Sequence, residues 1–217
     1  MPVAISKNTE TGLVGRGLSF QYKRKSPCLF RNLDITISPG ETVGLTGPSG
    51  SGKSTLAQIM GGFIKPLSGT LLFNDEPLPA RGFSPVQYIY QHPQLAVNPR
   101  WNGRKILSEA FEPSDQILEM LEISLDWLDR YPHELSGGEL QRLVVARALG
   151  TATKCILADE ISAMLDPLTQ ALIWRTLMNY KEKQGLSILV ISHDSHLMNK
   201  VCDRVVSLDN NIPGSTH

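Results

Sequence analysis

The sequence of 217 residues predicts an α/β fold whose central sheet is largely parallel. Short apolar runs alternate with stretches of helical periodicity, as they do where strands and helices take turns along a chain. Residues 17–37 differ, because they have the pattern of two antiparallel strands with a turn at 23–27. From residue 91 to residue 130 prolines and helix-period pieces replace the strands, which indicates a mostly helical insertion that continues through the helix opening at Ser136.

The remaining elements are expected in a regular order. Strands are predicted at 42–46, 69–74, 86–90, 155–158, 187–192 and 204–208. Helices are predicted at 54–63, 105–111, 115–121, 136–149, 168–183 and 195–201. The strands are short apolar runs bounded by turn-forming residues, and residues 210–217 form a polar tail.

Composition and charge exclude several classes of protein. Apolar residues make up 41% of the chain, enough for a sizeable core, and 21 basic residues balance 21 acidic ones. Proteins that bind nucleic acid usually carry a basic excess, so no nucleic-acid partner is expected. The longest apolar runs, such as 188–191, fall far short of the roughly 20 residues of a membrane-spanning helix. Residues 1–15 lack the apolar stretch of a signal peptide. Cys28, Cys155 and Cys202 form no CxxC pair, which favours reduced thiols in a cytosolic protein.

A phosphate-binding loop is predicted between the strand at 42–46 and the helix that follows it. It fits the pattern GxxxxGK[ST] and reads Gly47, Pro48, Ser49, Gly50, Ser51, Gly52, Lys53, Ser54. The glycines let backbone N–H groups point at a phosphate chain, and the helix start adds its positive dipole end. Lys53 adds a charge on the outer phosphates, the Ser54 hydroxyl can bind Mg²⁺, and Thr55 is close enough to help. A flexible Gly-Ser turn is the alternative, but it requires neither the Lys-Ser pair nor the helix.

Two carboxylates follow the apolar strand at 155–158. Asp159 is suited to hold Mg²⁺, often through water. Glu160 is suited to orient an attacking water or accept its proton. An acidic loop at a strand end is the structural alternative, and the phosphate loop upstream argues against it.

A Ser-Gly-Gly turn opens the helix at 136–149. Ser136 and Glu139 fit the S-x-x-E capping box, which is a purely structural explanation. Capping does not require Gly137 and Gly138, however, because glycine weakens a first helical turn. Two glycines suit a turn whose bare N–H groups approach an anion, so the chain contains a second candidate phosphate-binding helix start.

This turn resembles the signature motif of the ATP-binding-cassette (ABC) ATPases, which is Leu-Ser-Gly-Gly-x-x-Gln-Arg. Four further residues occupy positions that match functional loops of that family: Gln91 for the Q-loop, Asp166 for the D-loop, His193 for the switch histidine and Tyr22 for the aromatic residue that stacks on adenine. The resemblance covers residues 17–208. It implies a P-loop NTPase fold of ATP-binding-cassette type in a single domain, with 1–90 and 151–217 as the catalytic core and 91–150 as the helical subdomain.

The resemblance also implies a mechanism with ATP and Mg²⁺. In this family two subunits meet head to tail, and each ATP lies between the phosphate loop of one subunit and the signature turn of the other. Glu160 would then be the base, His193 the contact to the γ-phosphate, and Gln91 the contact to Mg²⁺ and water. Taken alone, a histidine after a buried strand or an aromatic residue in a hairpin is as easily structural, so the assignments of His193 and Tyr22 depend on their surroundings.

The sequence departs from the family pattern at several positions. Glu139 replaces the usual glutamine of the signature motif. A carboxylate near a phosphate is unfavourable, so Glu139 is expected to turn back and cap its own helix, leaving the site active. Ile161 stands where proline is common, and His92 replaces a frequent aspartate.

Residues 91–100 resemble the Q-D-P-x-x-x-L-N-P-R segment of ATPases from oligopeptide, dipeptide and nickel importers. The resemblance implies an ATP-hydrolysing subunit that powers import, at the cytoplasmic face of the plasma membrane. Its partners would be two membrane-spanning permease subunits, a second ATPase subunit that is a paralogue or another copy, and indirectly an extracytoplasmic substrate-binding protein. Because the sequence lacks the C-terminal cysteine cluster of some longer peptide-importer ATPases, a compact nickel or metallophore type is expected.

Three other functions compete with this one. A soluble cassette ATPase acting on nucleic acid or ribosomes usually has a coiled coil, a tandem duplicate or a basic surface, none of which the sequence contains. A P-loop kinase or GTPase would need neither the signature turn nor His193. A regulatory subunit that no longer hydrolyses ATP would not need Glu160.

Overall fold

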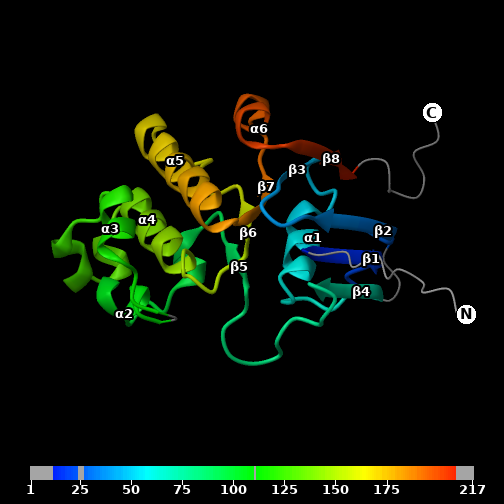
Figure 1. Ribbon diagram of the computed structural model, residues 1–217, viewed down its shortest axis with the longest axis horizontal. Coiled ribbons are helices and arrows are strands. Elements are labelled where there is room, and N and C mark those ends of the chain that lie inside the picture. Colours follow the sequence, from blue (N-terminus) through cyan, green and yellow to red (C-terminus); the bar gives the residue numbers. More distant parts are fainter. Residues whose placement is uncertain (1–11, 24–26, 110, 209–217) are drawn as a thin grey trace, which may run out of the picture.

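Two β-sheets organise the computed structural model, which describes residues 12–23, 27–109 and 111–208 (Figure 1). The antiparallel sheet has the order β2-β1-β4 and consists of β1 (Leu13–Phe20), β2 (Phe30–Ile37) and β4 (Ser68–Phe73). The parallel sheet has the order β5-β6-β7-β3-β8 and consists of β3 (Thr42–Thr46), β5 (Val86–Ile89), β6 (Cys155–Asp159), β7 (Ser187–Ile191) and β8 (Arg204–Ser207). The α/β fold class predicted from the alternating pattern is confirmed.

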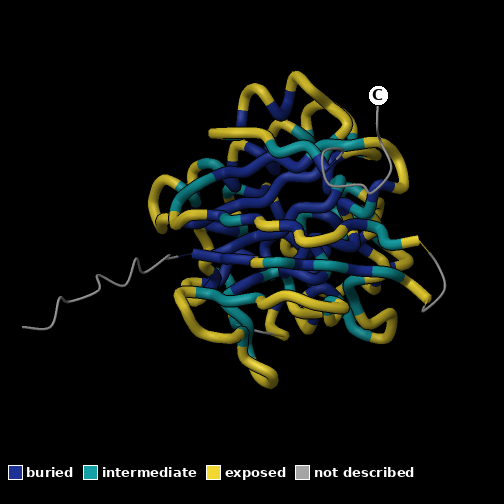
Figure 2. Tube along the Cα trace, turned by 90° about the vertical axis from the view of Figure 1, so that its right-hand side faces the viewer, coloured by how far each residue is buried: buried dark blue, intermediate teal, exposed yellow. Residues whose placement is uncertain are grey.

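The central strands of the parallel sheet separate two hydrophobic clusters. Every residue of β6 and β7 is buried, as expected for a parallel sheet covered on both faces. Because successive side chains alternate, Ile156 and Ala158 face one cluster while Cys155 and Leu157 face the other. Figure 2 shows these buried segments running through the interior, with exposed loops around them.

Helices cover both faces of the parallel sheet. Helix α1 (Lys53–Met60) contacts β1, β6 and β7 and so lies between the two sheets. The opposite face is covered by α4 (Gly137–Ala148), α5 (Pro167–Gln184) and α6 (Ser195–Val201). The side far from the antiparallel sheet carries α2 (Gly103–Leu107), α3 (Asp115–Met120) and the 3₁₀ helices η1 (Pro93–Ala96), η2 (Leu125–Asp129) and η3 (Pro132–Glu134) (Figure 1). Within the described ranges, none of the helices has both the length and the apolarity needed to cross a bilayer.

Several element boundaries differ from the predicted ones. Strand β1 begins at Leu13 rather than at residue 17, because Gly15 and Gly17 look like strand breakers while pairing with both β2 and β4 extends the strand. Helix α1 ends at Met60 rather than at residue 63, since Gly61 caps it and Gly62 has a φ of 78°. Helix α2 is also shorter than expected, and the three 3₁₀ helices were not predicted. The predicted polar tail, most of the polar N-terminus and the centre of the 23–27 turn lie outside the described residues.

Candidate nucleotide-binding site

The predicted functional segments meet at one edge of the parallel sheet. The phosphate loop follows β3, Gln91 lies just after β5, Asp159 and Glu160 end β6, and His193 follows β7. Because parallel strands share one carboxyl edge, these residues are brought together where ligands bind in open α/β sheets. A cleft of about 420 Å³ lies there, lined by Tyr22, Ser49, Gly50, Gly52, Lys53, Ser54, Thr55, Gln91, Asp159, Glu160, Ala163, Ile191 and His193.

The phosphate loop has a backbone that glycine makes possible. Gly52 precedes the first turn of α1 with a φ of 99°, and a Cβ atom there would come within 2.4 Å of Leu29 Cδ2. Lys53 is buried, and its Nζ donates hydrogen bonds to the carbonyls of Gly47 (2.8 Å) and Pro48 (2.9 Å). The loop therefore surrounds the ammonium group at the helix start, where an anion experiences both its charge and the helix dipole.

Two of the three predicted Mg²⁺ ligands, Ser54 and Asp159, are in contact. Ser54 Oγ donates to Asp159 Oδ1 at 3.1 Å, and Asp159 is only 8% exposed. Asp159 also accepts a hydrogen bond that the sequence pattern does not indicate, from the Tyr88 hydroxyl to Oδ2 at 2.5 Å. Burial, and then the bond to Asp159, raise the pKa of the Tyr88 hydroxyl above its usual range, so it remains a donor. A hydroxyl in the apolar β5 strand was the only local signal of this contact.

Glu160 and His193 lie beside each other at the cleft. Glu160 Oε1 is 3.5 Å from His193 Nε2, within ion-pair range of a protonated imidazole, while the Glu160 side chain is 14% exposed. Oε1 has no hydrogen-bond partner among the described residues. Burial raises the pKa of Glu160 against the opposing charge of His193. A carboxylate whose pKa is raised in this way is a stronger base than a carboxylate in water.

Tyr22 stands at the opening of the cleft. Its side chain is 67% exposed, its hydroxyl lies 2.5 Å from Thr55 Oγ1 on α1, and its ring meets Phe20 edge-on at 5.2 Å. The hydroxyl thus anchors an exposed ring beside the phosphate loop. This arrangement suits stacking on a planar base.

Gln91 lies just after β5, next to a residue that is hydrogen-bonded to the signature helix. It is partly buried and lines the cleft. Just before it, the carbonyl of Tyr90 accepts a hydrogen bond of 3.5 Å from Nε2 of Gln141, a buried residue of α4. The signature motif therefore contacts the backbone that precedes Gln91.

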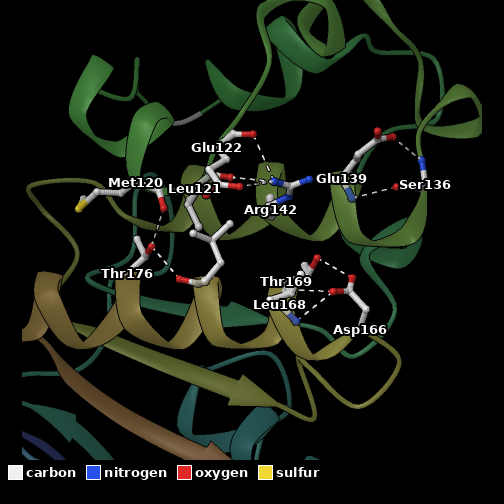
Figure 3. Close-up of polar contacts among 11 residues, drawn as sticks. Met120, Leu121, Glu122, Ser136, Glu139, Arg142, Asp166, Leu168, Thr169 and Thr176 are labelled. Atoms are coloured by element: carbon white, nitrogen blue, oxygen red, sulfur yellow. Dashed lines mark hydrogen bonds and ion pairs between the residues drawn. The ribbon is translucent and has the colours of Figure 1, made fainter.

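The signature turn forms the predicted capping box. Ser136 N donates to Glu139 Oε2 at 2.7 Å, and Glu139 N donates to Ser136 Oγ at 3.2 Å (Figure 3). The expectation that Glu139 turns back onto its own helix is confirmed. A Cβ atom added at Gly137 would meet nothing within 4 Å, so the outer surface of the turn is open.

Asp166 lies next to the signature turn and not in the cleft. It caps α5 by accepting hydrogen bonds of 3.0 Å from the N–H groups of Leu168 and Thr169 (Figure 3). The hydrogen bond from the Thr169 hydroxyl lowers the pKa of Asp166. A Cβ atom at Gly138 would lie 3.5 Å from Thr169 Cγ2. The starts of α4 and α5 therefore form one surface, and neither the signature turn nor Asp166 lines the cleft that holds Lys53.

Arg142, the last residue of the signature motif, fastens α4 to its neighbours. Its guanidinium donates to the carbonyls of Leu121 (3.3 Å) and Glu122 (3.2 Å) (Figure 3). It also lies over the Trp127 ring, 4.4 Å from the ring centroid. Leu121 is the C-cap of α3 and Glu122 follows it, so Arg142 joins α4 to the segment that ends α3. The sequence motif indicates the arginine but not this partner.

The fold and the cleft define a P-loop nucleotide-binding protein of the α/β class. Comparison with known families adds that the ABC transporter family model matches residues 30–163. The chain belongs to the ABC transporter family, and the prediction of an ATP-binding ATPase of this class is confirmed.

Curated relatives and solved structures agree with this assignment. A Brucella ovis protein named as a peptide import ATP-binding protein is 35% identical, over 92% of this chain and 70% of its own length. The nickel import ATP-binding protein NikE of Escherichia coli is 34% identical, over 88% of this chain and 78% of its own length. The dimeric post-hydrolysis state of the ATP-binding cassette MJ0796, bound to ADP and Pi, matches with a TM-score of 0.76 at 24% identity, over 90% of this chain and 93% of that one. CbiO1 of Clostridium perfringens matches with a TM-score of 0.74 at 24% identity, over 91% of this chain and 84% of that one. At this identity the two structures support the fold alone.

Proposed function

We propose that this protein is the ATP-hydrolysing subunit of a membrane importer for nickel, a metallophore or a peptide. The observation that carries the proposal is the separation of two phosphate-binding helix starts, one in the cleft with Lys53 and the other on the surface at Ser136. A single subunit has little use for both, whereas two subunits meeting head to tail would complete each other's sites. The names of the relatives and the importer-like segment at 91–100 support import and this class of cargo.

Within the cleft each residue has a proposed task. Lys53 and the loop N–H groups bind the phosphates, and Tyr22 stacks on the base. Glu160 accepts a proton from the attacking water, because its buried carboxylate is a strengthened base. His193, adjacent to Glu160, contacts the γ-phosphate. From the second subunit, Ser136 and the two following N–H groups close over the same phosphate, with Asp166 at the edge of the contact.

The residues present fit a magnesium ion that accompanies ATP. Ser54 and Asp159 offer adjacent oxygen ligands in the cleft, the donor type that Mg²⁺ prefers, and few protein ligands are needed when phosphate oxygens supply others. Gln91 lines the same cleft and is proposed as a further ligand. When bound, the ion neutralises phosphate charge.

The permease contact is proposed at a groove of about 650 Å³ beside β5. Its lining, here called the β5 groove, comprises Phe63, Gly82, Phe83, Ser84, Val86, Gln87, Tyr88, Tyr90, Leu95, Ala96, Glu109 and Arg147. Phe63 and Leu95 are exposed apolar side chains there. The groove adjoins the 91–150 segment, which we propose as the helical subdomain. Two permease subunits, a second ATPase subunit and indirectly a substrate-binding protein would complete the transporter at the cytoplasmic face of the membrane.

Photo-crosslinking tests the head-to-tail pair. A photoreactive benzoyl-phenylalanine replaces Leu168, which is exposed beside Asp166 at the start of α5, in the protein expressed in its native membranes. The sample is irradiated with and without Mg-ATP. We expect an ATP-dependent adduct with the phosphate-loop peptide of a second cassette, either another copy or a paralogue. The same replacement at the exposed Val205, on the edge strand β8, should give less of this adduct. Crosslinks confined to one chain in the presence of bound ATP would contradict the proposal.

Uptake by intact cells tests the cargo. Cells carrying Glu160→Gln in place of the wild-type gene are expected to lose uptake of radioactive nickel or of a labelled dipeptide, and the cargo that is lost identifies the transporter. Normal uptake of nickel, nickel–metallophore and peptide in these cells would refute an import function of this class.

A further inference from the structure

We propose that Tyr88 is a positioning residue that holds the Asp159 carboxylate in its metal-binding orientation. This inference rests on the proposed magnesium site. The two carboxylate oxygens have separate partners, Ser54 at Oδ1 and Tyr88 at Oδ2. The Ser54 hydroxyl and Asp159 Oδ1 would then bind the metal side by side. Tyr88 holds the other carboxylate oxygen, Oδ2, on the side facing the protein interior.

Strand pairing explains why Tyr88 reaches Asp159. Strand β5 runs parallel to β6, with Tyr88 opposite Leu157. Because side chains alternate along a strand, Asp159 lies on the same face as Leu157, one repeat further along. The long tyrosine side chain spans this diagonal, so the bond follows from the register of the two strands.

Burial makes this hydrogen bond strong. Tyr88 is 7% exposed and Asp159 is 8% exposed, and a hydroxyl bonded to a carboxylate gains strength where water is excluded. Among the described residues, Tyr88 is the one hydrogen-bond donor to Asp159 Oδ2. A phenylalanine at this position would leave that buried oxygen without its donor, and the carboxylate would be free to rotate.

Packing holds the tyrosine ring in place. The Tyr90 ring lies 4.5 Å away between centroids, and the Phe63 ring meets it edge-on at 5.8 Å. These contacts involve the ring alone, so Tyr88→Phe keeps them and removes only the hydroxyl. Tyr90→Phe is the matched control, because it deletes a neighbouring hydroxyl that has no bond to Asp159.

Fluorescent-ATP titration with Mg²⁺, and again with EDTA, provides a readout apart from turnover. For Tyr88→Phe we expect the Mg²⁺ concentration that gives half-maximal enhancement of nucleotide binding to rise by about 10- to 100-fold, the usual cost of losing an outer-shell partner. Affinity without metal should stay within about twofold, as hydrogen-bond loss at Asp159 leaves the phosphate loop intact. Electron paramagnetic resonance with Mn²⁺ should show the same weakening, and Tyr90→Phe should show neither effect.

Two further variants separate the possible failures. Ser54→Ala should weaken metal dependence in the same titration, and if it does not, the proposed magnesium site is wrong. If Ser54→Ala weakens it while Tyr88→Phe matches wild type, the Tyr88 proposal alone is overturned. Added to Asp159→Asn, Tyr88→Phe should cause no further loss, since it acts through that carboxylate. Independent, multiplying losses in the double variant would also overturn the proposal.

Discussion

Glu160→Gln is the change whose consequences the structure defines most fully. The amide has nearly the same volume as the carboxylate, so the variant should still bind ATP in the cleft. It cannot accept a proton, however, and general-base catalysis typically contributes a factor of about 10² to 10⁴. At 1.36 kcal/mol for each factor of ten, the barrier to hydrolysis should rise by about 2.7 to 5.4 kcal/mol.

The same substitution should change stability with a defined dependence on pH. Burial raises the pKa of Glu160 above its ordinary value of 4.5, so the ionised side chain destabilises the folded state at neutral pH. Removing that charge should therefore increase the free energy of unfolding near pH 7. The gain should disappear as the pH falls below 4.5, where the wild-type carboxyl is protonated in both the folded and the unfolded state.

Phosphate release and urea unfolding measure these two effects on the same preparation. Loss of turnover together with greater stability at neutral pH is the expected pair of results. Turnover within threefold of wild type would show that Glu160 is not the base. Lower stability at pH 7 would show that the carboxylate is better accommodated by its surroundings than its burial indicates.

Three other substitutions test separate parts of the molecule. Lys53→Ala should weaken ATP binding in an equilibrium titration by about 10- to 100-fold, the size of one charge-assisted hydrogen bond, and unchanged affinity would contradict its role. Glu139→Gln should keep ATPase activity within about threefold, because an amide oxygen can still accept from Ser136 N; a large change in turnover would mean that the carboxylate acts on the nucleotide. In urea unfolding, Leu143→Ala should cost about 2 to 5 kcal/mol, against about 0.5 or less for the exposed Leu168→Ala, and similar costs would contradict the packing described.

The parts of the site that the sequence predicts are those built from neighbouring residues. A phosphate loop is a local backbone conformation, set by glycines and by the start of the next helix. Residues 47–54 are therefore sufficient to predict it. The capping box at Ser136 and Glu139 is equally local, since its partners are one turn apart. In both cases a short sequence pattern is sufficient to determine the local geometry.

The contacts that the sequence does not predict join distant residues. Tyr88 and Asp159 are 71 positions apart, and they meet because β5 is the neighbour of β6, a strand order that no local pattern encodes. Arg142 likewise contacts Leu121, just after α3, which lies 21 positions earlier in the sequence. The start of β1 at Leu13 also depends on distant residues, because pairing with β2 and β4 on both edges outweighs the weak strand propensity of its glycines.

The hydrogen bond between Gln141 and the Tyr90 carbonyl has a consequence for how paired subunits would communicate. In the proposed head-to-tail arrangement, the helix bearing Gln141 would contact the neighbour's nucleotide, while Gln91, just after Tyr90, would contact the subunit's own. In that arrangement, a tilt of the helix when the neighbour loses its γ-phosphate would be transmitted to Gln91 through the Gln141 side-chain amide. ATP hydrolysis at the two sites would then be coupled, because each subunit would respond to the nucleotide bound by the other.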